Sequence, residues 1–259
     1  MDIPFYQIDA FTGTVFAGNP AGVCLLQDWL DDTVLQNIAA ENNLPETAFI
    51  IPQDNEYAIR WFTPEIEIDL CGHATLASGH VIFKYVDTGR EKVRFESKSG
   101  PLGVSLREDL LVMDFPSRMP EVCPAPQALI DGLDIKPIEV HLSRDYLALL
   151  ENEEQVRSLS PDMGRLNTLD CLGIIVTAPG DKVDFVSRFF APRAGIAEDP
   201  VTGSAHSTLI PFWAKRSGKT KLHALQLSKR GGELFCEHLG ERVAIGGQAT
   251  TYLSGTIMV

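Results

Sequence analysis

Gly72 and His73 stand directly before an apolar stretch that is typical of a buried helix. The unpaired N–H groups at the start of a helix bind anions, because the donors and the helix dipole both favour negative charge. Cys71 would lie at this positive end, where the pKa of a thiol is lowered. The segment therefore indicates a site for a small carboxylate or a developing enolate. A plain capping glycine, a satisfied buried histidine and an inert buried cysteine are the alternatives.

A second segment repeats this order of small residues. Thr202 precedes Gly203 and Ser204 at the start of another expected helix, and Asp199 lies five residues before the serine. Glycine at such a position lets the backbone approach a ligand closely. Asp199 is a candidate for proton handling, although an aspartate before a proline also suits a turn or a helix cap. The pairing of the two segments favours a shared function over two unrelated caps.

A carboxylate, Glu46, precedes residues 47–51, which are expected to form a buried strand. A carboxylate at the edge of a core is partly removed from water and binds its proton more tightly, which suits a general base. An exposed acid at the start of a strand is the simpler alternative. Glu46 is therefore a candidate catalytic residue.

A loose internal repeat must position these groups. Residues 60–64 resemble residues 188–192, 128 positions later, and on this alignment Ile68 corresponds to Ile196. The glycines at 72 and 203 are 131 positions apart. A helix-like stretch and an apolar strand precede each copy, at residues 32–51 and 153–177. The same order of features in both halves predicts two similar folding units.

The expected architecture is α+β, with two pseudo-symmetric lobes, each a curled, barrel-like sheet around a central helix. The first lobe covers residues 1–116 and the second covers residues 117–259, after a segment interrupted by prolines. Strand-like residues 242–259 leave open a return of the chain to the first lobe. The active site is expected in the cleft between the lobes.

Composition excludes several classes of partner. Lys and Arg number 22 against 35 Asp and Glu, a net charge of −13, which disfavours nucleic acid and anionic membranes. The basic segment 215–230 is interpreted as a solvated turn and strand. No apolar run reaches the roughly 18 residues of a membrane span, and residues 1–4 do not resemble a signal peptide. Five widely spaced cysteines indicate reduced thiols, so a cytoplasmic location is expected.

Cofactor motifs are absent from the sequence. No cysteine or histidine, including His206, has the spacing of a metal site, so no metal is expected. Glycine-rich nucleotide loops and the serine-hydrolase elbow are also missing. The sequence therefore gives no support for a nucleotide cofactor or for a serine hydrolase.

Taken together, five segments resemble the PhzF-like phenazine-biosynthesis family. They are Asp9–Thr12, Phe16–Val23, Asn43–Phe49, Asp69–Thr75 and Glu198–Ala205. The resemblance implies the diaminopimelate-epimerase-like fold, no cofactor and a homodimer. It also implies that Glu46 moves the proton, with Gly72, His73, Asp199, Gly203 and Ser204 as the remaining site residues.

Related racemases use two cysteines, one before each helix, and here Cys71 has only Thr202 as its counterpart. The sequence therefore predicts a cofactor-independent isomerase that moves a proton within a small anionic, carboxylate-bearing metabolite. Glu46, His73 and Asp199 are the expected catalytic residues, and the glycines, Ser204, Cys71 and Thr202 the expected binding residues. A Cys71-dependent racemase or epimerase, and a non-catalytic binding protein for small acids, are the alternatives.

Overall fold

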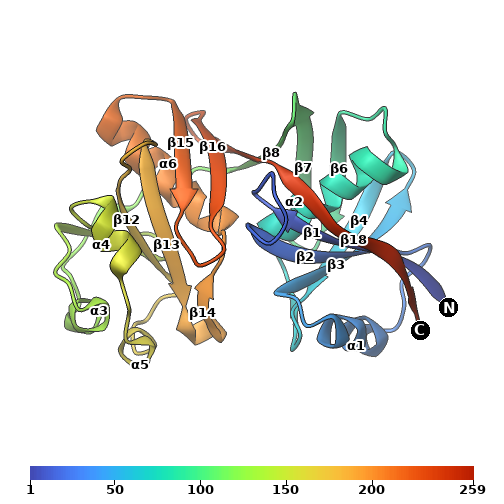
Figure 1. Cartoon of the computed structure of the whole chain (residues 1–259), viewed down its shortest axis with the longest axis horizontal. Coiled ribbons are helices and arrows are strands. Elements are labelled where there is room, and N and C mark those ends of the chain that lie inside the picture. The colour runs from blue at the N-terminus through green and yellow to red at the C-terminus, as the bar shows by residue number, and fades with distance from the viewer. The chain divides into compact units, whose positions relative to one another are not determined.

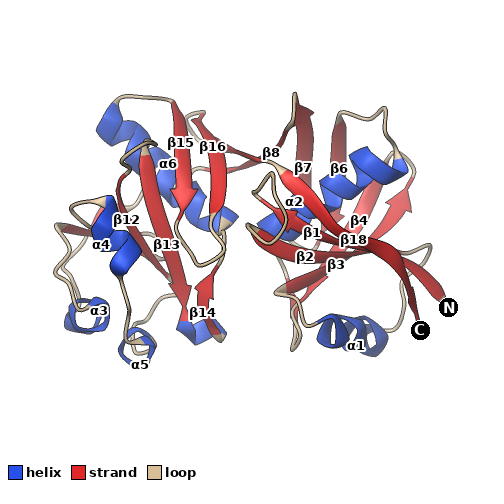
Figure 2. Cartoon of the chain, viewed as in Figure 1, coloured by secondary structure: helices blue, strands red, loops and turns tan.

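The computed structural model describes all 259 residues, which divide into two compact units. The first unit comprises Met1–Asp114 and Gly246–Val259, and the second comprises Phe115–Ile245. Both are α+β units rich in strands, as Figures 1 and 2 show. The last strand thus belongs with the first unit, a return that the sequence left open. None of the helices is long and apolar enough to cross a membrane.

The first unit is a mixed sheet with two helices. Its strands and helices are β1 (Asp2–Ala10), β2 (Asn19–Leu25), α1 (Asp32–Asn42), β3 (Glu46–Gln53), β4 (Glu56–Phe62), β5 (Glu67–Ile68), α2 (Gly72–Val81), β6 (Lys92–Ser97), β7 (Gly100–Arg107), β8 (Leu110–Pro116) and β18 (Ala249–Met258). A single π-helical stretch, Ile82–Val86, extends α2. Two pairs of strands are parallel: β2 with β3, and β4 with β6. In each pair a helix connects the first strand to the second.

Helix α2 lies inside its unit because nearly all of its residues are small or apolar. Eight of its ten residues are buried. The two buried hydroxyls form hydrogen bonds within the helix. Thr75 donates to the carbonyl of Cys71 at 2.6 Å, and Ser78 donates to the carbonyl of Ala74 at 2.8 Å, each one turn earlier. A side chain at Gly79 would lie 2.8 Å from Val104 on β7, so the absence of one allows the helix to pack closely on the sheet.

The second unit repeats this order. Its elements are β9 (Glu121–Val122), α3 (Gln127–Leu133), β10 (Glu139–Leu142), β11 (Tyr146–Leu149), α4 (Glu153–Ser158), α5 (Met163–Leu166), β12 (Ile174–Pro179), β13 (Phe185–Ala191), β14 (Ile196–Asp199), α6 (Gly203–Ser217), β15 (Lys221–Gln226), β16 (Gly232–His238) and β17 (Arg242–Gly247). A short 3-10 turn, Pro192–Ala194, connects β13 to β14. Strands β11 and β12, and β13 and β15, are the parallel pairs, again connected through helices.

A partly buried ion pair marks the repeat. In the first unit Arg60 Nε contacts Glu67 Oε1 at 2.7 Å, and in the second Arg188 Nε contacts Glu198 Oε1 at 2.6 Å. Arg60 lies on β4 and Arg188 lies on β13. Each glutamate lies on the short strand, β5 or β14, that precedes the buried helix. The predicted two-lobed α+β fold is confirmed by this correspondence and by the comparisons reported below.

The strand register corrects one detail of the repeat. Trp61 pairs with Ile68, whereas the corresponding Phe189 pairs with Asp199. Ile68 therefore corresponds to Asp199, and the alignment of Ile68 with Ile196 was wrong. The three additional residues of the second copy fall in the turn around Pro192–Ala194, before the short strand rather than after it.

Helix α6 contains a proline that leaves one carbonyl unpaired within the helix. Pro211 has no N–H, so the carbonyl of Ser207 loses its usual partner four residues later. The backbone N–H of Arg118 donates to this carbonyl at 2.9 Å instead. The proline thereby attaches the segment that follows β8 to the buried helix of the second unit.

Candidate active site

Three elements of the first unit begin at nearly the same point. Asn19 is the first residue of β2, Glu46 is the first residue of β3, and Gly72 is the first residue of α2. Because β2 and β3 are parallel neighbours and α2 packs on both, their starting residues meet. The structure thus brings Glu46 beside Cys71 and His73, as the candidate site requires.

The imidazole of His73 lies at the centre of this cluster. Its Nε2 is 3.0 Å from Glu46 Oε2, and its Nδ1 is 3.2 Å from Asn19 Nδ2 and 3.6 Å from Cys71 Sγ. The contact with Glu46 has the distance of an ion pair, and neither of the two atoms has another partner in the chain. The carboxylate oxygen therefore keeps acceptor capacity for a substrate proton.

The cluster is almost closed to water. Asn19 is 0% exposed, His73 5%, Cys71 6% and Glu46 8%. Burial by itself lowers the pKa of His73, but the Cys71 sulfur and the Glu46 carboxylate raise it, and the net pKa is well above the usual value. An imidazolium paired with a carboxylate is the form that this environment favours.

For Cys71 the surroundings favour the inert buried thiol over the thiol of lowered pKa. Burial and the negative charge of Glu46 raise the pKa of this thiol, and they outweigh the opposing effect of His73. The start of α2 would lower the pKa of an exposed thiol, but here desolvation dominates. The thiol is therefore a poor source of thiolate.

The stability of the protein should depend on His73 in a defined pH range. Because the folded pKa is raised above the unfolded value of about 6.5, the histidine stabilises the fold fully below that pH, and the contribution is lost as pH rises through the folded pKa. We expect the difference in unfolding free energy between the wild type and His73→Gln to shrink steadily above pH 6.5. Urea unfolding of both proteins at several pH values measures this difference in unfolding free energy.

The half-exposed His238 provides the matched control for this experiment. His238→Gln should leave the pH dependence of unfolding as it is in the wild type. A difference between the wild type and His73→Gln that grows with pH would contradict the raised pKa.

In the second unit Thr202 occupies the place of Cys71. Both residues are the N-cap of the buried helix, with extended backbone conformations. The Thr202 hydroxyl donates to Asp199 Oδ2 at 2.5 Å, and the helix then begins with Gly203 and Ser204. Asp199, Thr202, Gly203 and Ser204 therefore lie together at one helix start. Thr202 takes part through its hydrogen bond to Asp199.

Gln226, at the end of β15, holds this turn in place. Its Oε1 accepts the Thr202 N–H at 2.8 Å, while its Nε2 donates to the Asp199 carbonyl at 2.8 Å and to Thr202 Oγ1 at 3.1 Å. The amide is 1% exposed. His206 contributes one more contact, from its Nδ1 to the Thr202 carbonyl at 2.8 Å, and burial lowers its pKa to about 4. His206 is thus a neutral, structural histidine.

One group of residues has ligand atoms near enough for a metal ion, although the sequence predicted none. Atoms of Glu46, Cys71 and His73 lie within 4.8 Å of one another. The Cys71 sulfur lies 3.6 Å from Nδ1 and a Glu46 carboxylate oxygen lies 3.0 Å from Nε2 of the same ring. One ring nitrogen, the sulfur and one carboxylate oxygen would be three ligands, so the distances alone are compatible with one ion. The absence of a metal stays a prediction.

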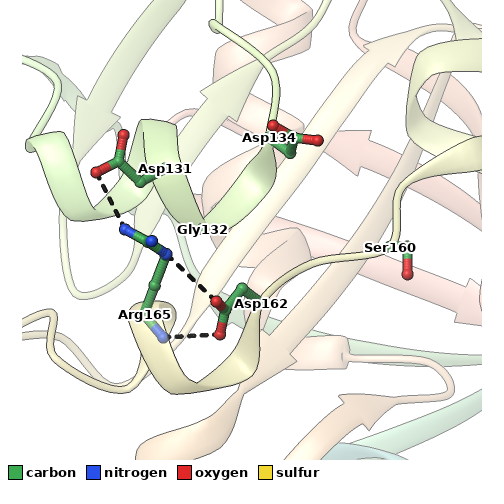
Figure 3. A pocket seen from close by; sticks show the side chains of 6 residues that line it. All are labelled: Asp131, Gly132, Asp134, Ser160, Asp162 and Arg165. Carbon is green, nitrogen blue, oxygen red and sulfur yellow. Dashed lines mark hydrogen bonds and ion pairs between the residues drawn. The ribbon is translucent and has the colours of Figure 1, made fainter.

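A surface hollow of about 520 Å³ lies elsewhere on the second unit (Figure 3). Asp131, Asp134 and Asp162 line it, and Arg165 contacts two of these carboxylates, at 3.3 Å in each case. The side chains that line the hollow carry a net negative charge, which is unsuited to an anionic substrate. None of the predicted site residues lines the hollow.

Sequence reasoning did not identify Asn19 and Gln226 as site residues. Asn19 lies in the segment Phe16–Val23, directly before a proline, but no role was assigned to it. Gln226 carries no local signal, because its partner Thr202 is 24 positions away in the sequence.

A family model described as phenazine biosynthesis-like protein matches residues 8–255. The chain belongs to the PhzF family. An uncharacterized isomerase of Pseudomonas aeruginosa is 49% identical to it over 257 residues, 99% of each chain. The crystal structure of a PhzF-family phenazine biosynthesis protein of Enterococcus faecalis is 50% identical, covers 100% of both chains and has a TM-score of 0.98.

The PhzF fold extends to more distant enzymes. A hydroxyproline epimerase of Agrobacterium vitis shares the fold with a TM-score of 0.62 at 10% identity, over 99% of this chain and 92% of its own. The predicted family and the diaminopimelate-epimerase-like fold are both confirmed, and the chain is an isomerase of this family.

Proposed function

We propose that this chain is a cofactor-independent isomerase that moves a proton within a small, carboxylate-bearing substrate, with Glu46 as general acid and base. The observation that carries the proposal is the buried pair of Glu46 Oε2 and His73 Nε2, 3.0 Å apart at the start of α2. The family's named isomerases support the reaction class. A homodimer and a cytoplasmic location stay predictions.

The chemistry follows from the surroundings of Glu46. A carboxylate removes a proton from the carbon beside a carboxyl or carbonyl group, and the electron pair moves onto the oxygen as an enolate. Where a double bond of the substrate is conjugated with the enolate, the charge is shared with a second carbon, and the carboxyl group of Glu46 returns the proton to that carbon. His73 carries a positive charge next to Glu46, so it stabilises the carboxylate between turnovers and can donate to developing negative charge.

The remaining predicted residues would bind the substrate. Backbone N–H groups at Gly72, and at Gly203 with Ser204, suit an anionic oxygen. Asp199 accepts a hydrogen bond from the Thr202 hydroxyl. We propose that any proton that Asp199 gives or takes passes through this hydrogen bond. That the two helix starts serve one substrate stays a prediction.

Solvent deuterium exchange tests this function. Small amino and hydroxy acids that raise the melting temperature by mass action are first selected. They are then incubated with the protein in deuterated water, and the substrate is examined for deuterium by mass spectrometry. Exchange that proceeds equally well with wild type and with Glu46→Gln would exclude Glu46 as the base. Binding without any exchange would favour a non-catalytic binding protein.

Replacement of Cys71 separates the proposal from a thiol-dependent racemase. Because burial and Glu46 raise the pKa of this thiol, we expect Cys71→Ala to retain the exchange rate within about tenfold. Cys71→Ser, which keeps the size of the side chain, serves as the control for a packing defect. Loss of exchange in both variants, with Glu46→Gln only mildly affected, would establish the racemase instead.

A further inference from the structure

A second surface hollow lies within the first unit, at the C-terminal end of α2, and has a volume of about 290 Å³. Its wall combines the end of the helix with the hairpin of β7 and β8. Small-molecule sites usually have volumes of roughly 300–1,000 Å³, so this hollow suits a ligand at the small end of that range. Among its lining residues are His80, Phe83, Lys84, Leu106, Asp109 and Leu111.

The helical wall of the hollow contains an unusual turn. The Asp87 N–H donates to the Ile82 carbonyl at 2.8 Å, five residues earlier, which is the hydrogen bond of a π-helix. Such turns are rare and occur frequently at functional sites. His80, Phe83 and Lys84 are three and four positions apart, so one face of this helical segment presents all three to the hollow.

Two opposite charges line this hollow without pairing with each other. Lys84 forms no ion pair in the chain, and its ammonium group lies 5.5 Å from the centre of the Tyr85 ring. Asp109, in the turn between β7 and β8, accepts a hydrogen bond from Gln248 Nε2 but likewise forms no ion pair. His80 adds no charge at neutral pH, because burial and the charge of Lys84 lower its pKa to about 4. The hollow therefore offers one cationic and one anionic group to a ligand.

The rest of the wall is apolar. Phe83 and Leu111 are buried, and Leu106 is half-buried beside them on the hairpin. An apolar group of a ligand that covers these side chains leaves water, which favours binding. A charged ligand without such a group would use only the polar part of the hollow.

We propose that this hollow is a second binding site of the chain and that it takes a free α-amino acid with an apolar side chain. The carboxylate of the amino acid would contact Lys84, its ammonium group would contact Asp109, and its side chain would lie on Phe83 and Leu111. Charge-assisted contacts of this kind are the stronger polar contacts in proteins. A phosphate or a simple carboxylate would leave Asp109 unpaired and repelling it.

This site is separate from the candidate active site at the start of the same helix. His80 follows His73 by seven positions, which is about 10 Å along an α-helix. Neither Glu46 nor Cys71 lines the hollow. The proposal therefore does not depend on the proposed function.

Titration of the full chain with four probes at constant ionic strength tests the site. The probes are L-leucine, leucinamide without the carboxylate, 4-methylpentanoate without the ammonium group, and glycine without the apolar side chain. Binding is followed by NMR shifts of the backbone amides. We expect L-leucine to bind about tenfold or more tightly than each of the others, with shifts in residues 80–86 and 106–111.

Two variants assign the charges, and two others serve as matched controls. Lys84→Gln and Asp109→Asn should each weaken L-leucine binding about tenfold or more, and both side chains are exposed, so the fold should tolerate the changes. Lys92→Gln on β6 and Asp54→Asn in a turn also each remove an exposed charge of the first unit. These two controls should bind L-leucine as the wild type does.

Several results would overturn the proposal: no binding of L-leucine, equal affinity in the wild type, Lys84→Gln and Asp109→Asn, or leucinamide or 4-methylpentanoate binding as tightly as L-leucine. Shifts confined to residues 71–75 would overturn it too, because they would place the amino acid at the candidate active site. Glu46→Gln should keep the shifts in residues 80–86, whatever its effect on deuterium exchange. Failure of the hollow and failure of the assigned base are thus distinguishable.

Discussion

Glu46→Gln is expected to lower the rate of deuterium exchange into the substrate by about 10²- to 10⁴-fold, the usual contribution of a general acid or base. Glutamine has nearly the same shape and can still contact His73, but it cannot take up a proton. Glu46 is 8% exposed and is the first residue of a strand, so its place is fixed by the sheet rather than by its charge. Single-turnover exchange followed by mass spectrometry measures the effect.

The control for this variant is Glu41→Gln. Glu41 is an exposed glutamate on α1, and its replacement should leave exchange unchanged. Circular dichroism and the melting temperature of Glu46→Gln must match the wild type closely enough to exclude unfolding. Full exchange activity in a folded Glu46→Gln protein would refute the mechanism, whatever the substrate.

Much of the fold was predictable because the chain is locally consistent. Helix α1 and strand β3 form where the helix-like stretch and the apolar strand of residues 32–51 were expected, and α2 begins at Gly72 as predicted. Helix α3 was missed, since seven residues directly after a proline-rich segment carry too little periodicity. What fixes α3 is the burial of Leu129 and Leu133 against distant residues of the second unit.

Candidate residues were identified by type and spacing, but their contacts were not predictable in the same way. Local reasoning placed Cys71 at a helix start and expected a lowered pKa, yet its pKa is raised by burial and by Glu46, which is 25 positions away in the sequence. The same limit hid Asn19, whose contact with His73 spans 54 positions. Motifs thus located the site, and the fold determines which groups within it are charged.

Asn19 also shows how a turn that is distant in the sequence from His73 can affect the position of its imidazole. Its backbone follows Gly18, which has a φ of +63°, a conformation that other residues adopt at a cost. Asn19 then starts β2 opposite Ala10 of β1, and its side chain reaches His73. Any displacement of this turn therefore moves the amide that contacts the imidazole.

Gly18→Ala should consequently destabilise the fold by about 2–4 kcal/mol and slow deuterium exchange in whatever protein remains folded. A Cβ at this position would lie 2.1 Å from the Ala10 carbonyl oxygen and 2.7 Å from Thr12, and backbone cannot give way as a flexible side chain can. Gly103→Ala is the matched control, because a Cβ there meets nothing within 4 Å. Urea unfolding measures both variants, and a Gly18→Ala protein as stable as Gly103→Ala would show that the turn does not constrain Asn19.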